Sequence, residues 1–146
     1  IAVAGLMLAA CGQAETPETP VQPEAVETPA PEAVAIGGVD LTKPAQALGT
    51  EPFWGVAITA ETLTVTGVDR PEIVVQNPGA RIDGETAVIA AKLADGGDLV
   101  VTLRAAECSD GMSDWTYPLE AEVKLGAETL KGCADSQASL DARPRP

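Results

Sequence analysis

The 146-residue sequence contains no histidine. Because imidazole is the usual general base, this absence excludes Ser-His-Asp and Cys-His catalysis and removes a common zinc ligand. Aromatic residues make up 3% of the chain, and 9 basic residues stand against 22 acidic ones. The net charge of −13 repels nucleic acid, so no nucleic-acid partner is expected. The sequence therefore predicts no catalytic residues and no histidine-ligated metal site.

Long apolar runs are also missing. No run after Cys11 approaches the roughly 20 residues that cross a bilayer. The apolar run Ile1–Ala10 has the length of a signal-peptide hydrophobic region, and Leu8-Ala9-Ala10-Cys11 resembles a bacterial lipobox. We therefore expect residues 1–10 to be a signal-peptide fragment and Cys11 to carry a diacylglyceryl lipid, which is a covalent anchor and not a cofactor.

Cysteine is scarce, with three residues in the chain. In an exported protein an odd number leaves one thiol unpaired, and lipidation of Cys11 leaves Cys108 and Cys133 to pair. Closing a loop of about 25 residues stabilises a fold by roughly 3 kcal/mol on the chain-entropy model. The alternative, a reactive or metal-binding Cys108, lacks a histidine to support it.

The lipid predicts a location. Two or more acyl chains anchor a protein stably, so the mature chain is expected to be tethered to a membrane. Gly12, and not Asp, follows the cysteine. By resemblance to known lipoprotein sorting signals, this favours the periplasmic face of the outer membrane over the inner membrane.

A linker rich in proline and glutamate is predicted from the lipidated cysteine to Ala47. Its Glu-Thr-Pro and Pro-Glu-Ala units contain no aromatic residue and cannot bury a core. Such a tract favours an extended, polyproline-like arm that is disordered as a whole.

The folded part is predicted to span residues 48–134, too few for more than one domain. Short β-branched segments alternate there with turn signals such as Asn77-Pro78-Gly79. The expected strands are Val56–Thr59, Leu63–Thr66, Ile73–Val75, Ala87–Ala90, Leu99–Leu103, Tyr117–Leu125 and Glu128–Cys133. They predict an all-β fold, an antiparallel meander forming a small closed or half-closed barrel, with a β-sandwich as the alternative. Residues 135–146 are expected to be a disordered tail.

The candidate binding residues are aromatic and acidic. In a strand, Phe53 and Trp54 point to opposite faces, so one belongs to the core and the other to the rim. The segment from Cys108 to Tyr117 gathers Asp110 and Asp114 among glycine and serine residues. Their carboxylates predict either a turn in which Asp and Ser bond the backbone or, as the alternative, a calcium site. If Trp54 and Trp115 both lie outside the barrel, they would form a binding surface with these acids.

Four separated motifs carry a family resemblance. They are Gly49–Trp54, Cys108–Asp114, Tyr117-Pro118 and Leu130–Ala134. In these motifs the chain resembles a group of uncharacterised proteobacterial envelope lipoproteins, loosely grouped with the META-type heat-shock lipoproteins. The resemblance covers nearly all of residues 48–134 and implies a β-rich periplasmic domain. The family supplies no agreed activity and no established catalytic residues. Trp115 departs from the pattern, since a small or basic residue is commoner there.

The expected function is that of a lipid-anchored, non-catalytic envelope domain that binds a protein or acts in stress tolerance. Its partners would be the membrane, through the lipid, and an envelope protein or a cationic protein. One alternative is an inhibitor of a basic, lysozyme-type cell-wall hydrolase, although the Ser-Gly-x-x-Tyr pattern of such inhibitors is missing. The other is a small-ligand carrier, which requires an apolar cavity in the barrel.

Overall fold

The computed structural model describes Gly12 and residues 34–144, which are mostly β-strand. β1 (Ala35–Ile36) and β2 (Val39–Asp40) form a two-stranded ribbon, and nine further strands form one antiparallel sheet. The sheet strands are β3 (Ala45–Thr50), β4 (Phe53–Ile58), β5 (Thr62–Gly67), β6 (Ile73–Gln76), β7 (Arg81–Asp83), β8 (Thr86–Lys92), β9 (Asp98–Ser109), β10 (Thr116–Leu125) and β11 (Glu128–Ser136). One helix, α1 (Gln137–Asp141), follows. The predicted all-β class and every predicted strand are confirmed.

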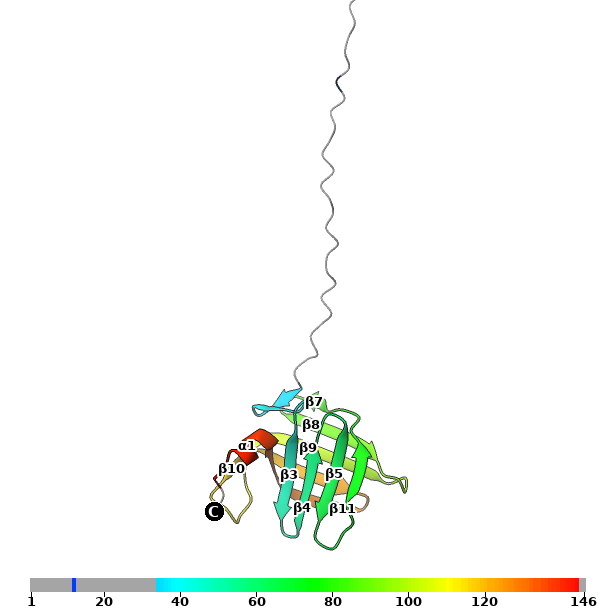
Figure 1. The fold of residues 1–146 in the computed structure, drawn as a ribbon, viewed down its shortest axis with the longest axis vertical. Helices are drawn as coiled ribbons and strands as arrows, with labels where there is room; N and C mark the ends of the chain where they lie inside the picture. Colours follow the sequence, from blue (N-terminus) through cyan, green and yellow to red (C-terminus); the bar gives the residue numbers. More distant parts are fainter. Residues whose placement is uncertain (1–11, 13–33, 145–146) are drawn as a thin grey trace, which may run out of the picture. The chain divides into compact units, whose positions relative to one another are not determined.

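The strand order shows how the sheet closes. Each strand of the sheet pairs with its neighbour in the chain except β6 and β7, which lie at opposite edges, while β11 pairs with β3. Residues 77–80 connect these two edges, and a link of that length spans at most about 18 Å. The sheet must therefore curl until its edges come close, as Figure 1 shows. The result is the half-closed barrel that the sequence predicts, and not a sandwich.

Every second side chain along the strands points inward and fills the barrel. On β10, Leu119, Ala121 and Val123 are buried on the inner face, while Glu120 and Glu122 point outward. The fully buried side chains are almost all aliphatic. The largest of them are Ile58, Leu63, Ile89, Leu99, Leu103, Leu119, Val56, Val65, Val101 and Val123. With so few aromatics, the core depends on many medium-sized side chains interdigitating across the curl.

Trp54 is the large exception inside the barrel. It pairs with Gly49 across β3 and β4, and its indole lies against Gly132 of β11. A Cβ atom on Gly49 would collide with the indole nitrogen, and one on Gly132 would collide with the carbonyl oxygen of Leu48. The two glycines thus provide the flat space that the ring occupies.

The ordered domain begins earlier than the sequence predicts. The sequence predicts a linker up to Ala47, but the ribbon and β3 already lie within residues 35–50. Gly37 and Gly38 both have positive φ, as a two-residue hairpin turn with this twist requires. Ile36, Val39 and Leu41 are buried in the core, and this apolar burial orders the segment. Cys11 and residues 13–33 lie outside the described residues.

The chain also stays ordered beyond the predicted end. Asp135 and Ser136 complete β11, so the expected disordered tail is wrong up to Pro144. Ser136 caps α1 by accepting a bond from the Ser139 backbone N–H, and Gln137 N–H donates to Pro44 O at 2.9 Å. In the described residues no helix has the length and apolar character that a membrane span needs.

Candidate binding site at the disulfide loop

Cys108 and Cys133 form a disulfide, as predicted, with a Cα–Cα distance of 5.6 Å. The bond joins the end of β9 to β11. The segment that starts at its first cysteine, Cys108–Trp115, is called the disulfide loop below. Cys133 pairs with Glu120 and Leu48 on the outer face of the sheet, yet it is 1% exposed. The loop therefore folds back over the outer face and covers it.

A bulge directs the loop onto that face. The pairing of β9 with β10 shifts between Tyr117 and Leu119, where β9 contains an extra residue. Pro118 lies at this point and has no N–H to give to the ladder, which explains why regular pairing is interrupted there. Bulges bend a strand and increase its twist. β9 consequently bends just before Cys108, while Cys108 and Ser109 stay paired with Tyr117 and Thr116 of β10.

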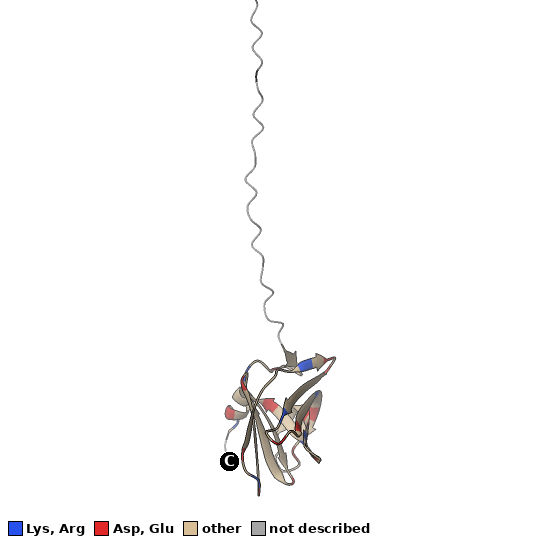
Figure 2. Ribbon diagram, turned by 90° about the vertical axis from the view of Figure 1, so that its right-hand side faces the viewer, with Lys and Arg blue, Asp and Glu red and all other residues tan. Residues whose placement is uncertain are grey.

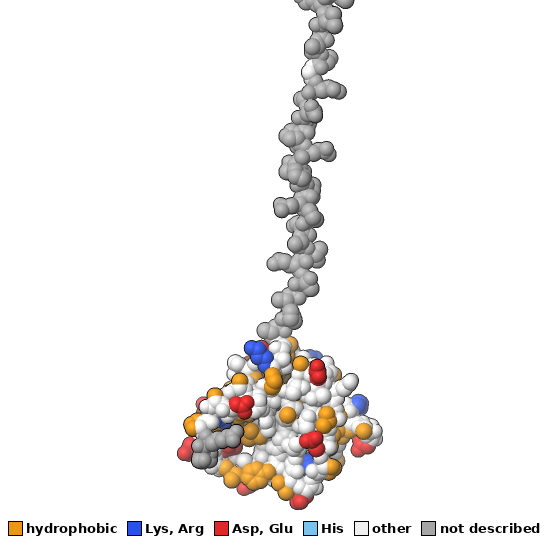
Figure 3. Space-filling view, viewed as in Figure 1, with side chains coloured by type: hydrophobic (Ala, Val, Ile, Leu, Met, Phe, Trp, Pro, Cys, Tyr) orange, Lys and Arg blue, Asp and Glu red, His pale blue; other side chains and the backbone are white. Residues whose placement is uncertain are grey.

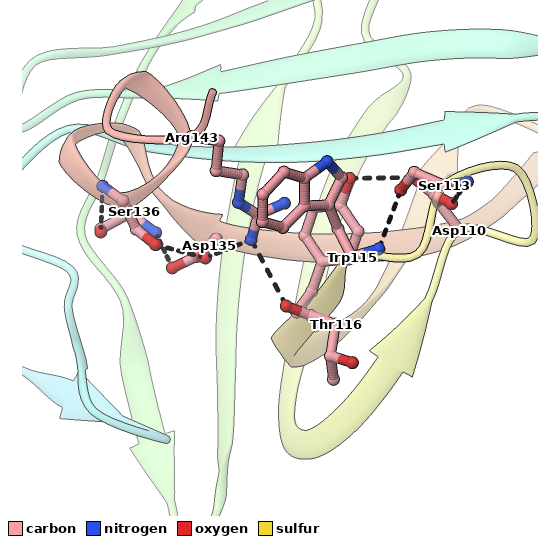
Figure 4. Close-up of polar contacts among 9 residues, drawn as sticks. Asp110, Ser113, Trp115, Thr116, Asp135, Ser136 and Arg143 are labelled. Carbon is pink, nitrogen blue, oxygen red and sulfur yellow. Dashed lines mark hydrogen bonds and ion pairs between the residues drawn. The ribbon is translucent and has the colours of Figure 1, made fainter. Parts of the chain in front are cut away.

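The carboxylate of Asp110 organises the loop. It accepts bonds from the backbone N–H groups of Met112 and Ser113 at 2.9 and 2.8 Å, from Ser113 Oγ at 2.7 Å and from Tyr117 Oη at 2.9 Å. The Ser113 N–H bond is the largest cause that lowers the pKa of Asp110. Burial, and then the bond to Asp110, raises the pKa of Tyr117. Figure 4 shows several of these contacts.

This geometry matches the turn that the sequence predicts. The Asp110 oxygens are occupied by donors of the loop and by Tyr117 of β10, and Asp114 is exposed. Among the described residues, no group of three or more Cys, Asp or Glu side chains lies close enough together to hold a metal ion. The loop is also tied to the β3–β4 turn, because Thr50 Oγ1 donates to Asp110 O at 3.1 Å.

A groove of about 630 Å³ runs along the outer face beside the loop. Its floor is the outward side of β3, β9, β10 and β11, and its walls are the disulfide loop and the β3–β4 turn. Glu120 and Glu122 line it together with Arg104 and Lys131, and these side chains form ion pairs at 2.9 and 3.9 Å. The groove is thus polar and partly charge-compensated.

Three large apolar side chains are exposed on the segments beside the groove. Met112 of the loop is 68% exposed, and Phe53, opposite Thr50 in the β3–β4 pairing, is 55% exposed. Trp115, at the end of the loop, is 40% exposed. These residues are called the loop patch below. Hydrophobic side chains gather at the lower margin of the domain in Figure 3, near the β3–β4 turn.

The structure separates the predicted binding residues. Trp54 is 5% exposed and belongs to the core, so its place on a binding surface is corrected, while Phe53 takes the outward position. The predicted alternation of the pair is right, but sequence alone did not tell which residue faces inward. Trp115 and Asp114 lie outside, and Asp110 is bound into the loop. The two tryptophans therefore do not form one surface.

Arg143 covers part of Trp115. Its guanidinium carbon lies 4.3 Å from the centre of the Tyr117 ring and 5.3 Å from that of Trp115. It donates to Asp135 Oδ2 at 2.8 Å and to Thr116 O at 3.4 Å, as Figure 4 shows. Asp135 is 5% exposed. A desolvated cation–π contact is worth about 2 kcal/mol. Arg143 therefore ties the segment after α1 to Trp115 and Tyr117.

Acidic residues outnumber basic ones in residues 34–144, and Figure 2 marks both kinds along the ribbon. In residues 34–144, every basic side chain except Arg81 lies in an ion pair with an Asp or Glu. Acids such as Glu107 and Asp114 have no such partner among the described residues. The surplus charge is therefore negative and favours cationic partners.

Sequence reasoning missed several residues of this site. The sequence leaves Phe53 as a possible core residue, assigns no role to Met112, and predicts a disordered tail where Arg143 lies. A signal was available for Arg143, since it follows an N-cap serine and a short helical segment ahead of Pro144. Nothing in the sequence links it to Asp135.

Comparison of the chain with protein-family models, with curated proteins and with solved structures finds no match. The resemblance to envelope lipoproteins therefore stays a prediction from the four motifs.

Proposed function

We propose that this protein is a lipid-anchored, non-catalytic domain of the bacterial cell envelope that binds a protein partner through the loop patch. One observation carries the proposal: Phe53, Met112 and Trp115 are exposed on segments that the disulfide, Asp110 and Thr50 hold together. Aromatic residues and methionine are enriched in protein interfaces. A rigid support lowers the entropy lost on binding.

The sequence and the disulfide support the location. A disulfide persists in an oxidising compartment, in agreement with export. The lipobox-like Leu8–Cys11 supplies the anchor, with the periplasmic face of the outer membrane as its proposed site. Export and lipidation together explain why the cysteine number is odd.

The chemistry of the site supports a binding role without catalysis. The chain contains no histidine, and the carboxylate of Asp110 already accepts four hydrogen bonds, from Met112, Ser113 and Tyr117. Arg104, Glu120, Glu122 and Lys131 in the groove are paired with one another. A general acid or base must present its proton site to the substrate. The charged groups of the groove instead face one another in ion pairs.

The anchor is tested by growing bacteria that express the chain with an alkyne analogue of palmitate. The wild-type protein is expected to become labelled, and Cys11→Ser is expected to abolish the label. The double variant Cys108→Ser/Cys133→Ser is the matched control, because it removes thiols without touching the lipobox and should stay labelled. Equal labelling of the Cys11→Ser protein would contradict the anchor.

The partner is tested by cross-linking intact cells and identifying captured proteins by mass spectrometry. The double variant Phe53→Ser/Met112→Ser should lose a partner that the wild type captures. Val68→Ser/Val74→Ser is the matched control, since both valines are 56% exposed and lie outside the loop patch. Loss of the same partner in both double variants would contradict binding by the patch.

The surplus negative charge favours a second candidate, an inhibitor of a basic cell-wall hydrolase. Such an inhibitor should reduce lysozyme activity, and the inhibition should weaken steeply with salt. The densely packed aliphatic interior gives less support to a small-ligand carrier.

A further inference from the structure

The surroundings of Arg143 have the composition of a recognition pocket for a guanidinium group. The rings of Tyr117 and Trp115 lie 4.3 and 5.3 Å from its guanidinium carbon. The carboxylate of Asp135 and the carbonyl of Thr116 accept its N–H groups. Aromatic faces with a buried carboxylate match a planar, delocalised cation that donates along its edge.

The segment that supplies Arg143 is held by polar contacts. α1 contributes no buried residue, and it is fixed by its Ser136 cap, by Gln137 N–H on Pro44 O and by Ser139 Oγ on Asp135. The side chain of Arg143 is 15% exposed, so it is the most deeply placed charged group of residues 137–144. A segment that buries little apolar surface opens more readily than the core beneath it.

The buried carboxylate of Asp135 makes the pocket selective for a cation. Its side chain is 7% exposed, and a buried carboxylate without a counter-charge is strongly unfavourable. When residues 137–144 move away, the carboxylate of Asp135 becomes available to another cation in the position of Arg143. The exposed Asp114 beside Trp115 and the acidic surface favour the approach of a basic polypeptide.

We infer that the pocket formed by Trp115, Tyr117, Thr116 and Asp135 binds an arginine side chain of a cationic partner protein, and that Arg143 occupies it in the free protein. The C-terminal segment is then an internal competitor that the partner displaces. Displacement also uncovers Trp115, which enlarges the loop patch. The inference rests on the proposed function, because it names the chemistry of the partner that the patch binds.

The test titrates the purified full chain in detergent with acetyl-Ala-Arg-Pro-amide, a copy of residues 142–144, and follows the two indole N–H signals by NMR. In Arg143→Gln the Trp115 signal should shift to saturation while the Trp54 signal stays in place. In the wild type Arg143 fills the pocket most of the time, and only the fraction with an empty pocket binds the peptide. The wild type should therefore bind the peptide roughly tenfold more weakly than Arg143→Gln does. The lysine analogue of the peptide should bind less tightly than the arginine peptide.

Arg104→Gln is the matched control. Like Arg143, Arg104 pairs with an acid, Glu120, at 2.9 Å, and its loss frees a carboxylate and removes one positive charge. Equal affinity of the two variants, or equal affinity for arginine and lysine peptides, would show that charge alone attracts the probe and would overturn the pocket. If Arg143→Gln does not fold, the wild type decides, because a saturable Trp115 shift must then accompany movement of the Arg143 side-chain N–H signal.

This experiment separates the inference from the proposed function. If the peptide shifts no Trp115 signal while partner capture still depends on Phe53 and Met112, the pocket is overturned and the loop patch stands. If the peptide binds while partner capture does not depend on Phe53 and Met112, the pocket stands and the loop patch is overturned.

Discussion

The two tryptophans of this domain are held by different kinds of force. Trp54 lies inside the barrel, where Gly49 and Gly132 leave it a flat space, and it is 5% exposed. Trp115 lies outside, 40% exposed, next to Arg143. Shape and volume position the first, while charge and hydrogen bonds position the second. The interior should therefore respond to changes in side-chain size, and the disulfide-loop end to changes in charge and pH.

Replacing each tryptophan by alanine gives the largest contrast. Trp54→Ala removes a buried indole that spans three strands and should lower the free energy of unfolding by about 3–5 kcal/mol. Trp115→Ala removes a half-covered ring and should lower it by about 1 kcal/mol. Urea denaturation of both variants measures the difference, and equal losses would mean that Trp54 is not the core residue that its burial indicates.

Gly132→Ala probes the space beside Trp54. A Cβ atom there meets the backbone oxygen of Leu48, which cannot rotate away, so overpacking should cost about 3 kcal/mol. Gly97→Ala is the control, because its Cβ atom meets the flexible Asp95 carboxylate at 3.0 Å and should change stability by less than about 0.5 kcal/mol. Thermal unfolding compares the two, and a tolerant Gly132 would show that the inner face adapts to the added volume.

The same contrast explains what could be predicted from sequence. Alternation such as Leu119-Glu120-Ala121 and turn glycines report strand position directly, so the all-β meander follows from local patterns. The Asp110 turn is equally local, since its donors Met112 and Ser113 lie within three residues. Trp54, and not Phe53, points inward because Gly49 and Gly132 of two other strands leave room for its ring. No local sequence pattern contains that information.

The ends of the domain were missed for a related reason. Residues 45–48 form a strand from Ala, Gln and Leu, which have little β preference, and their order comes from pairing with β4 and β11. The place of Arg143 depends on Asp135 at the end of β11 and on two rings that the disulfide loop and β10 supply. Such sites depend on tertiary contacts and cannot be derived from composition.

Arg143→Gln tests how far charge holds the outer end. The variant leaves the carboxylate of Asp135 without its cation and removes the contact with Tyr117, so unfolding should become easier by about 2 kcal/mol. Arg104→Gln breaks an exposed pair, with side chains 60% and 46% exposed, and should cost less than about 1 kcal/mol. Urea midpoints at low and moderate salt check the pair; equal losses would place Arg143 among ordinary surface arginines.

Asp110→Asn gives the smallest effect, and pH sharpens it. Hydrogen bonds from Ser113 lower the folded-state pKa of Asp110, so the ionised carboxylate stabilises the fold above its unfolded pKa of about 4. This contribution, about 1 kcal/mol for a partly exposed group, decreases as pH falls below that value toward the lowered pKa. The stability curves of wild type and Asp110→Asn should therefore be separate at pH 7 and converge in acid.

Subtracting the two curves isolates the loop from the other acids. Asp40, whose pKa is also lowered through its bonds with Thr42, is present in both proteins and cancels in the difference. Asp114→Asn, at an exposed position of the same loop, should change stability at pH 7 by less than about 0.5 kcal/mol. A difference that stays constant from pH 7 into acid would mean that Asp110 holds the loop by shape, as Trp54 holds the core, and the contrast between the two regions would disappear.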